Sequence, residues 1–258
     1  MSDEVLTLRG RNIVITGAAQ GIGRAIADLV LELGGTVSAV DLNADGLESL
    51  QTQAGSDKVL ALAGSVADVS FAQGVVEQAV EQFGAVHGLV NNAGITRPAM
   101  IEKMTPEQWQ QVVDIHLTGS FYFLQAVGRH ALMRSRAGDK SGASIVNISS
   151  DAGRRGTIGQ INYSAAKAGL LGVTMSAARE WAKYNVRVNT VGFGVVETPM
   201  TETIRGEKFA ETYLAQIPLG RWAEVGEVAR PVCFLLSDAA SYITGQHLSA
   251  NGGYTIGT

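Results

Sequence analysis

Cysteine is nearly absent from this chain of 258 residues, which has 1, Cys233, in the apolar run VCFLL. A single cysteine excludes a disulfide within the chain and any cysteine-based metal cluster. Histidine is scarce too, and the 4 histidines at positions 87, 116, 130 and 247 share no spacing typical of metal ligands. The sequence therefore predicts no metal site, and Cys233 is expected to be a small core residue.

Long hydrophobic runs and a surplus of positive charge are also missing. No apolar run approaches the ~20 residues of a membrane span, and the acidic N-terminus MSDEVLTLRG lacks the apolar core of a signal peptide. The net charge of -4 disfavours a nucleic-acid-binding surface as the main function. These absences predict a cytoplasmic protein with neither a membrane nor a nucleic acid as partner.

Short β-branched runs alternate with longer helical patterns along the chain. Strands are expected at 12-16, 36-40, 58-62, 86-90, 143-148, 186-191 and 247-251, and helices near 22-33, 44-53, 70-83, 106-134, 160-184 and 225-236. Apolar strands that are each followed by a helix are typical of a parallel sheet covered on both faces. We predict an α/β fold in one domain, 1-258, with a doubly wound, Rossmann-type, seven-stranded parallel sheet and a loop at 134-142. Ligands are expected at the carboxyl ends of the strands.

A glycine-rich turn, TGAAQGIG, joins the first predicted strand to the first predicted helix. Gly17, Gly21 and Gly23 would let the backbone turn tightly and approach a pyrophosphate at the helix N-terminus. The alternative is a glycine turn without a ligand. Its place in a strand–turn–helix unit favours a dinucleotide site.

Asp41 ends the second predicted strand, at the distance from the glycines where an acidic residue binds the adenosine ribose 2′-hydroxyl. A 2′-phosphate there would be repelled by about 4 kcal/mol per pair of unit charges at ~4 Å and an effective dielectric of ~20. Gln20, beside the glycines, offers no compensating positive charge. We therefore expect NAD(H) rather than NADP(H). The alternative is that Asp41 only caps the helix that starts near Asn43.

Ser150, Tyr163 and Lys167 form a candidate catalytic set. The spacing in YSAAK puts Tyr163 and Lys167 on one helix face, with Cβ atoms about 5–6 Å apart. A phenol has a pKa near 10, so it needs a neighbouring cation to act as a base at neutral pH. Tyr-x-x-x-Lys alone is commonly a surface pair. Together with Ser150 at the end of a strand, in a dinucleotide fold, it predicts proton transfer to or from a substrate oxygen.

These motifs together resemble the short-chain dehydrogenase/reductase family along essentially the whole chain. The segments that match in order and spacing are TGAAQGIG (16-23), NNAG (91-94), Ser150, YSAAK (163-167), VRVNTVGFG (186-194), ETPM (197-200) and YITGQHLSANGG (242-253). The chain is most similar to the 3-oxoacyl-acyl-carrier-protein reductases, in GQINYSAAKAGLLG (159-172), YLAQIPLGR (213-221) and FLLSDAASYITGQ (234-246).

The resemblance implies hydride transfer between a nicotinamide and a carbonyl or secondary alcohol, with a 3-oxoacyl thioester of acyl-carrier protein or CoA as substrate. Tyr163 would be the acid/base, Lys167 would bind the nicotinamide ribose and lower the tyrosine pKa, and Ser150 would polarise the carbonyl. The cofactor would be held by Gly17, Gln20, Gly21, Ile22, Gly23, Asp41, Ser65, Val66, Asn91, Ala93, Gly94, Tyr163, Lys167, Gly194, Val196 and Thr198, with Val191 beside the nicotinamide.

His116, in VVDIHLTGS, stands where the family usually has a catalytic asparagine. The resemblance implies a main-chain carbonyl that helps to hold a water linking the lysine to solvent. The imidazole, with an ordinary pKa near 6.5, would add a pH-dependent step. Simple packing is the alternative.

Other positions depart from the family pattern. Ser65 replaces an aspartate in the adenine pocket, and Phe193 replaces a proline, as a wall or as an aromatic surface beside the nicotinamide. The pair Arg154-Arg155 would bind an acidic group of the substrate or be solvated. The resemblance implies that two arginines dock the acyl-carrier protein. Tyr184, next to Lys183, stands at the position of one of them, and Arg134 or Arg136 would have to supply the other.

Segment 194-216 is expected to be a lid over the substrate, and helices 106-134 and 160-184 are expected to build a homotetramer. Two other functions stay open. One is an NAD-dependent dehydrogenase of secondary alcohols, sugars or cyclic ketones, and the other is a non-catalytic dinucleotide sensor.

Overall fold

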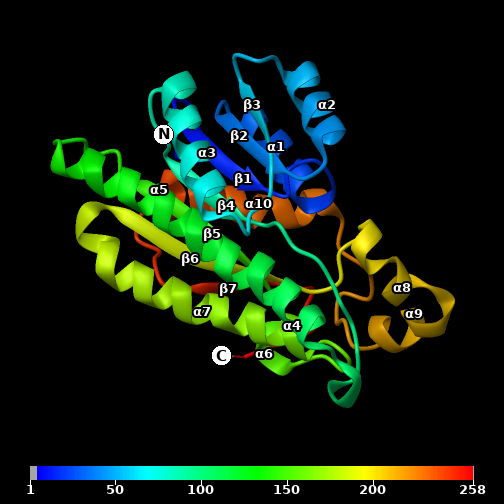
Figure 1. Cartoon of the computed structure of the whole chain (residues 1–258). Coiled ribbons are helices and arrows are strands. Elements are labelled where there is room, and N and C mark those ends of the chain that lie inside the picture. Colours follow the sequence, from blue (N-terminus) through cyan, green and yellow to red (C-terminus); the bar gives the residue numbers. More distant parts are fainter. Residues whose placement is uncertain (1–4, 258) are drawn as a thin grey trace.

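A computed structural model describes residues 5–257 and contains a seven-stranded parallel sheet (Figure 1). Its strands, in the order β3-β2-β1-β4-β5-β6-β7, are β1 (Asn12–Thr16), β2 (Thr36–Asp41), β3 (Val59–Ala63), β4 (Gly88–Asn91), β5 (Ala143–Ser150), β6 (Val186–Phe193) and β7 (His247–Ala250). The chain reverses direction across the sheet between β1 and β4, as in doubly wound folds. The predicted fold class is therefore confirmed.

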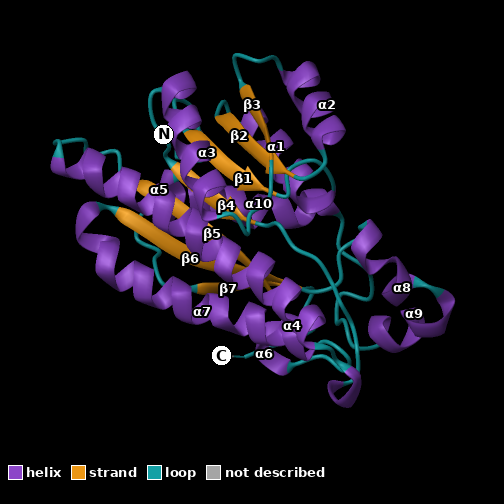
Figure 2. Ribbon diagram, viewed as in Figure 1, coloured by secondary structure: helices purple, strands orange, loops and turns teal. Residues whose placement is uncertain are grey.

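Helices cover both faces of this sheet (Figure 2). One apolar core lies under α1 (Gly21–Glu32), α2 (Ala44–Ala54) and α10 (Val225–Leu236). A second core lies on the opposite face, under α3 (Val69–Phe83), α5 (Gly119–Arg136) and α7 (Ile161–Trp181). The four central strands β1, β4, β5 and β6 are buried almost throughout, because helices pack on both of their faces.

The long helix predicted at 106-134 is interrupted. It consists of α4 (Pro106–Val113), a π turn (Asp114–Thr118) and α5, which ends at Arg136, inside the predicted loop. The helix predicted at 160-184 ends as α7 at Trp181 and continues as a 3₁₀ turn, Ala182–Tyr184. The edge strands β3 and β7 are only partly buried, and β5 and β6 bury polar side chains, so the expectation of strands that are apolar throughout is wrong for β5, β6 and β7.

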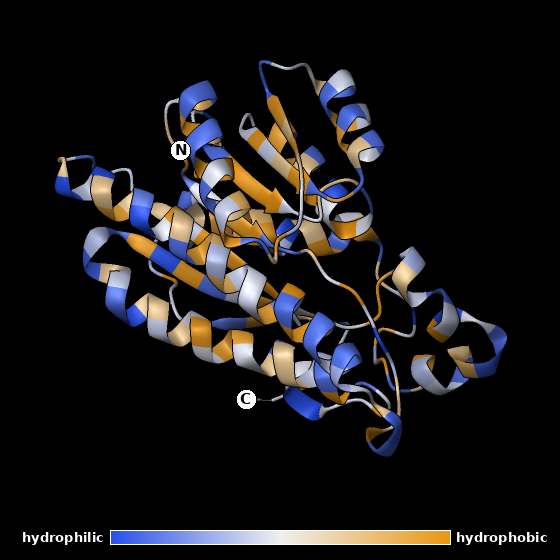
Figure 3. Ribbon diagram, viewed as in Figure 1, coloured by the Kyte–Doolittle hydropathy of each residue, from blue (hydrophilic) through white to orange (hydrophobic). Residues whose placement is uncertain are grey.

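Three short helices lie at the carboxyl edge of the sheet, where no helix was predicted. They are α6 (Ala152–Arg155), directly after β5, and α8 (Glu202–Arg205) and α9 (Glu207–Leu214), after β6 (Figure 1). The hydropathy colouring mixes polar and apolar residues along α8 and α9 (Figure 3). Within residues 5–257, no helix has both the length and the apolarity to cross a bilayer.

Candidate active site

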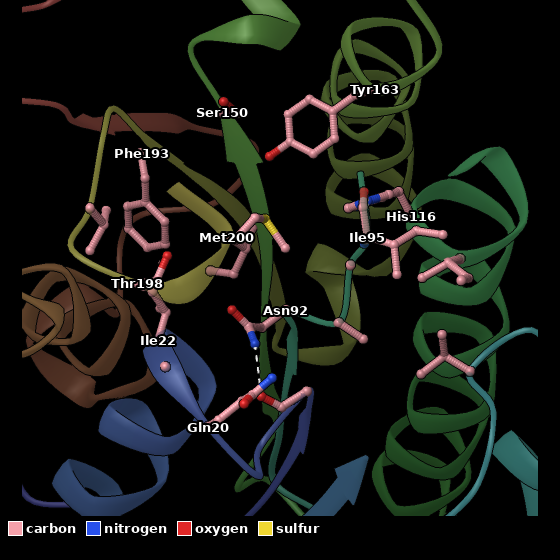
Figure 4. Close-up of a pocket in the computed structure, with 18 of the residues that line it drawn as sticks. Gln20, Ile22, Asn92, Ile95, His116, Ser150, Tyr163, Phe193, Thr198 and Met200 are labelled. Carbon is pink, nitrogen blue, oxygen red and sulfur yellow. Dashed lines mark hydrogen bonds between the residues drawn. The ribbon is translucent and has the colours of Figure 1, made fainter. Parts of the chain in front are cut away.

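A cavity of about 390 Å³ opens at the carboxyl edge of the sheet (Figure 4). It brings together residues from the glycine turn, from the ends of β2, β4, β5 and β6, and from α7. Of the predicted site residues, its lining includes Gly17, Gln20, Gly21, Ile22, Asp41, Ser65, Val66, Ala93, Gly94, His116, Ser150, Tyr163, Lys167, Gly194, Val196 and Thr198. The candidate cofactor and catalytic residues therefore share one cavity.

The glycine turn is shaped for close approach. Gly17 and Gly21 have φ values of 70° and 56°, which favour glycine. Gly23 is not in the cavity lining, and a Cβ at this position would overlap the main-chain oxygen of Gly17. Gly23 therefore supports the turn, while Gly17 and Gly21 leave its concave side open at the N-terminus of α1. This geometry fits the pyrophosphate of a dinucleotide.

Thr16 ties this turn to the next segment of the cavity wall. Its hydroxyl accepts hydrogen bonds from the amides of Asn92 and Ala93, both at 3.0 Å. The side-chain amide of Asn92 donates to the main-chain oxygens of Thr16 and Gly17, at 3.0 and 3.2 Å. The two walls of the cofactor cleft are thus held at a fixed spacing.

Asp41 lies at the carboxyl end of β2, in the cavity wall. One carboxylate oxygen accepts from the amide of Ala19 and the other from the amide of Asn43, both at 3.0 Å. Asn43 is itself the residue that caps α2, through Gly46. Asp41 therefore braces the glycine turn rather than capping the helix, and each of its oxygens keeps lone pairs for a ligand hydroxyl.

Ser150 and Tyr163 line the same end of the cavity, with the phenol oxygen directed into it (Figure 4). Burial raises the pKa of Tyr163 above its usual value near 10, and a hydrogen bond with Ser150 opposes this rise. Burial therefore opposes the lowering of the tyrosine pKa that the resemblance implies for Lys167 and a bound nicotinamide. The phenol is therefore protonated at neutral pH.

Lys167 is buried below the tyrosine. Its ammonium nitrogen donates to the main-chain oxygen of Ile148 at 2.6 Å and lies 5.5 Å from the centre of the Tyr163 ring. Burial lowers the pKa of Lys167 from 10.5 to about 7, because the charged form loses its hydration. The lysine therefore titrates near neutral pH, within electrostatic reach of the tyrosine.

His116 lies in the π turn and is only 2% exposed. Its Nε2 lies 3.0 Å from the amide nitrogen and 2.8 Å from the carbonyl oxygen of Ile95, and its ring meets that of Tyr163 edge to face, with centroids 5.0 Å apart. Burial, with Lys167 as a second cause, lowers the pKa of His116 to about 3. The expected titration near 6.5 is therefore wrong, and the imidazole is neutral at physiological pH.

The main-chain carbonyl of His116 accepts a hydrogen bond from the Ser120 hydroxyl at 2.7 Å. Gly94 faces the imidazole so closely that a Cβ there would overlap it. The larger side chain at position 116 thus fits because residue 94 is glycine.

Asn91 and Val191 lie outside the cavity lining. The Asn91 amide donates to the Ser120 main-chain oxygen at 3.0 Å and to Asn147 Oδ1 at 2.9 Å, below the cavity floor. Val191 is fully buried within β6. The neighbouring Asn92 faces the cavity instead, because side chains alternate along a strand and its extension.

Several wall residues were not predicted. They carry apolar side chains or lie in segments without a motif, and are Leu42, Ile95, Ile115, Ile148, Pro199, Met200 and Thr201. The motif ETPM contains Pro199 and Met200, and strand alternation after Gly88 could have favoured Asn92 over Asn91. Phe193 does line the cavity, as a buried side chain at the end of β6, paired in register with Ser150.

Arg154 and Arg155 do not line the cavity, and both form hydrogen bonds with other residues of the chain. Arg154 donates to Ser249 Oγ at 3.2 Å and to the main-chain oxygen of Gly257. Arg155 donates to Gln216 Oε1 at 3.2 Å, and its guanidinium carbon lies 4.2 Å from the centre of the Tyr254 ring. Neither arginine lines the cavity, and Arg155 is exposed, so the solvated alternative fits Arg155 better than binding of an acidic group in the cavity.

The far ends of α5 and α7 carry the candidate docking cations. Arg134 is bound within its own loop, to Asp139 at 2.8 Å and to the main-chain oxygen of Gly142 at 2.6 Å. Arg136 instead lies over the ring of Tyr184, 5.9 Å from its centre. Of the two arginines, Arg136 is the one beside Tyr184.

Comparison with known proteins agrees with this geometry. A family model described as enoyl-(acyl carrier protein) reductase matches residues 17–255. The 3-oxoacyl-[acyl-carrier-protein] reductase of Thermotoga maritima is 43% identical over 97% of this chain and 100% of its own length. The acetoacetyl-CoA reductase of a Synechocystis species is 39% identical over 96% and 98%.

Solved structures match as well. One described as a putative short-chain alcohol dehydrogenase from Sinorhizobium meliloti superposes with a TM-score of 0.90 at 34% identity, over 97% of this chain and 98% of that one. The sheet order, the glycine turn and the Ser150–Tyr163–Lys167 set agree with these similarities over the full length. The chain belongs to the short-chain dehydrogenase/reductase family of nicotinamide-dependent oxidoreductases, which act on CH-OH groups.

Proposed function

We propose that this protein reduces 3-oxoacyl thioesters with NADH, in the cytoplasm. The observation that carries the proposal is the single cavity in which Ser150, Tyr163 and Lys167 face the glycine turn and Asp41. The names of relatives at 39–43% identity, a 3-oxoacyl-carrier-protein reductase and an acetoacetyl-CoA reductase, support the substrate class.

The bound nicotinamide would supply the hydride, and the chain's own residues would handle the substrate oxygen. Ser150 hydrogen-bonds the carbonyl oxygen and orients it towards Tyr163. Tyr163, protonated because burial raises its pKa, donates its phenolic proton to that oxygen. A protonated Tyr163 phenol suits the reduction, because the carbonyl oxygen of the substrate must receive a proton.

Lys167 stabilises the phenolate that remains after the proton has left. The ammonium form of Lys167 predominates below its pKa of about 7, so this stabilisation weakens as the pH rises through that value. His116 and Ile95 hold the tyrosine ring and the adjoining wall without carrying charge.

Cofactor preference is proposed from Asp41. Its carboxylate lies in the cavity wall with lone pairs free for ribose hydroxyls, and it would repel a 2′-phosphate. The expected result is a higher kcat/KM with NADH than with NADPH. Asp41→Asn should narrow that preference by about 10- to 100-fold, since it removes the repelling charge. Asp45→Asn, an exposed charge in the first turn of α2, is the matched control and should leave the ratio unchanged.

A substrate panel tests the reaction itself. NADH oxidation is followed with acetoacetyl-CoA, the same acyl group on acyl-carrier protein, crotonyl-CoA, and simple ketones and sugars. The proposal requires the 3-oxoacyl thioesters to give the highest kcat/KM. A preference for crotonyl-CoA would reassign the chain to enoyl reduction, and turnover of ketones or sugars alone would favour a dehydrogenase of secondary alcohols, sugars or cyclic ketones. Tight NADH binding with no turnover at all would favour a non-catalytic dinucleotide sensor.

A further inference from the structure

The helices of the proposed lid, α8 and α9, have no buried residue. A short helix that buries no side chain gains little from core packing, and helices of this length are marginal by themselves in water. Their position at the mouth of the cavity therefore depends on contacts at the two ends of the segment.

The N-terminal end of the lid is fastened by Arg205, the last residue of α8. Its guanidinium donates to Thr201 Oγ1 and to the main-chain oxygen of Thr198, both at 3.1 Å. Thr198 and Thr201 line the cavity. This end is thus tied to the wall that faces the cofactor.

The C-terminal end is fastened by an aromatic stack. Tyr213, in the last turn of α9, stacks on Tyr254 with ring centroids 6.2 Å apart and an interplanar angle of 27°. The guanidinium of Arg155 lies over Tyr254 and also bonds Gln216 Oε1, just beyond α9. One arginine therefore connects α6, the lid and the chain's C-terminal segment, which lies beside α6 in Figure 1.

The C-terminal segment is itself tied to the catalytic loop. The side-chain amide of Asn251 donates to the buried carboxylate of Asp151 at 2.8 Å, one residue after Ser150. Gly252 has a φ of +66°, and its main-chain oxygen accepts from the amide of Leu219 at 3.1 Å. A Cβ at Gly252 would press against Ile217, so glycine is needed for this close approach.

We propose that residues 251–257 form a clasp that holds lid helix α9 at a fixed position relative to the segment that follows Ser150. Arg155, Tyr213 and Tyr254 are its positioning residues, because they join the three segments without touching the cavity. The clasp sets how the lid lies over the bound substrate, and so acts on substrate binding more than on the proton transfer. Only the kinetic test with a carbonyl substrate rests on the proposed function; the clasp itself does not.

The test compares full-length variants with NADH present. Tyr254→Ala removes the ring that both Tyr213 and Arg155 contact, whereas Tyr254→Phe keeps it. Ile256→Ala, at a side chain 83% exposed in the same segment, is the matched control. Amide hydrogen exchange of residues 207–214 should be about tenfold faster in Tyr254→Ala, and unchanged in Tyr254→Phe and Ile256→Ala.

Arg155→Ala and Arg155→Lys give an independent second pair, which decides the question if Tyr254→Ala does not fold. Arg155→Ala should also speed exchange in α9, with partial recovery in Arg155→Lys. Unchanged exchange in a folded Tyr254→Ala or Arg155→Ala variant overturns the clasp. This readout needs no substrate, so it stands even if the proposed reaction is wrong.

Kinetics separates a clasp from general loosening of the fold. For the carbonyl substrate that the panel identifies, Tyr254→Ala should raise KM about three- to tenfold and change kcat less than twofold, with the Kd for NADH unchanged. A fall in kcat of about three- to tenfold with an unchanged KM would contradict a role in positioning the lid.

Discussion

Tyr163 carries the most direct prediction at the scale of single residues. Tyr163→Phe removes the proton donor and leaves the ring packed against His116. Turnover should fall by at least about a thousandfold, near the loss expected when a general acid is removed, while NADH binds as before. Stopped-flow or steady-state NADH oxidation, together with a fluorescence titration of NADH, measures the two effects. Substantial remaining activity would show that another group donates the proton.

His116 makes a prediction about stability. The folded protein holds this imidazole neutral down to a pKa of about 3, whereas the unfolded chain protonates it near 6.5. Between these values the unfolded state binds more protons, so the free energy of unfolding falls as the pH falls below about 6.5. At pH 5 the loss from this residue is about 2 kcal/mol.

Replacing His116 should therefore reduce the acid sensitivity of the fold. His116→Asn should lose about 2 kcal/mol less than the parent between pH 8 and pH 5, in urea titrations at one fixed protein concentration. The same variant should keep its activity and show no new shift in its pH–rate profile, because the imidazole does not titrate there. A profile that moves near pH 6.5 would restore a relay role for the side chain.

At the scale of elements, the strands and the helices that cover them were predicted because burial leaves a pattern in the sequence. β1, β5 and β6 are rich in β-branched residues, and α10 was placed at its observed bounds, 225-236. The break of the long helix into α4 and α5 was not predicted, because a π turn keeps both the apolar face and the helical residue types.

The lid shows where such reasoning stops. α8 is too short to carry a hydrophobic period, α9 is amphipathic over only eight residues, and neither buries a residue, so both hold their place through contacts with distant segments. Arg155 and Tyr254 are 99 residues apart in the chain, and nothing local indicates that they meet. Likewise, the motif NNAG indicated the cavity, but which asparagine faces it depends on how β4 ends.

At the scale of the whole molecule, the cavity lies at the carboxyl edge while large apolar side chains are exposed on the outer helices. On α5, Phe121 is 43% and Met133 60% exposed, and on α7, Met175 is 52% exposed. Exposed apolar groups on neighbouring helices are typical of an interface between subunits. The two helices named from the sequence as the tetramer contact thus carry side chains suited to it.

The last prediction concerns that assembly. The protein should have a mass in solution near four times the 27.1 kDa of one chain, by light scattering after size exclusion. Phe121→Glu combined with Met175→Glu places charges on the proposed contact and should lower the mass, because an unpaired charge is costly to bury in an interface. Ile158→Glu, at a loop side chain 88% exposed, should leave it unchanged. A monomeric parent would rule out the tetramer, and a double variant with the parent's mass would place its contact on other elements.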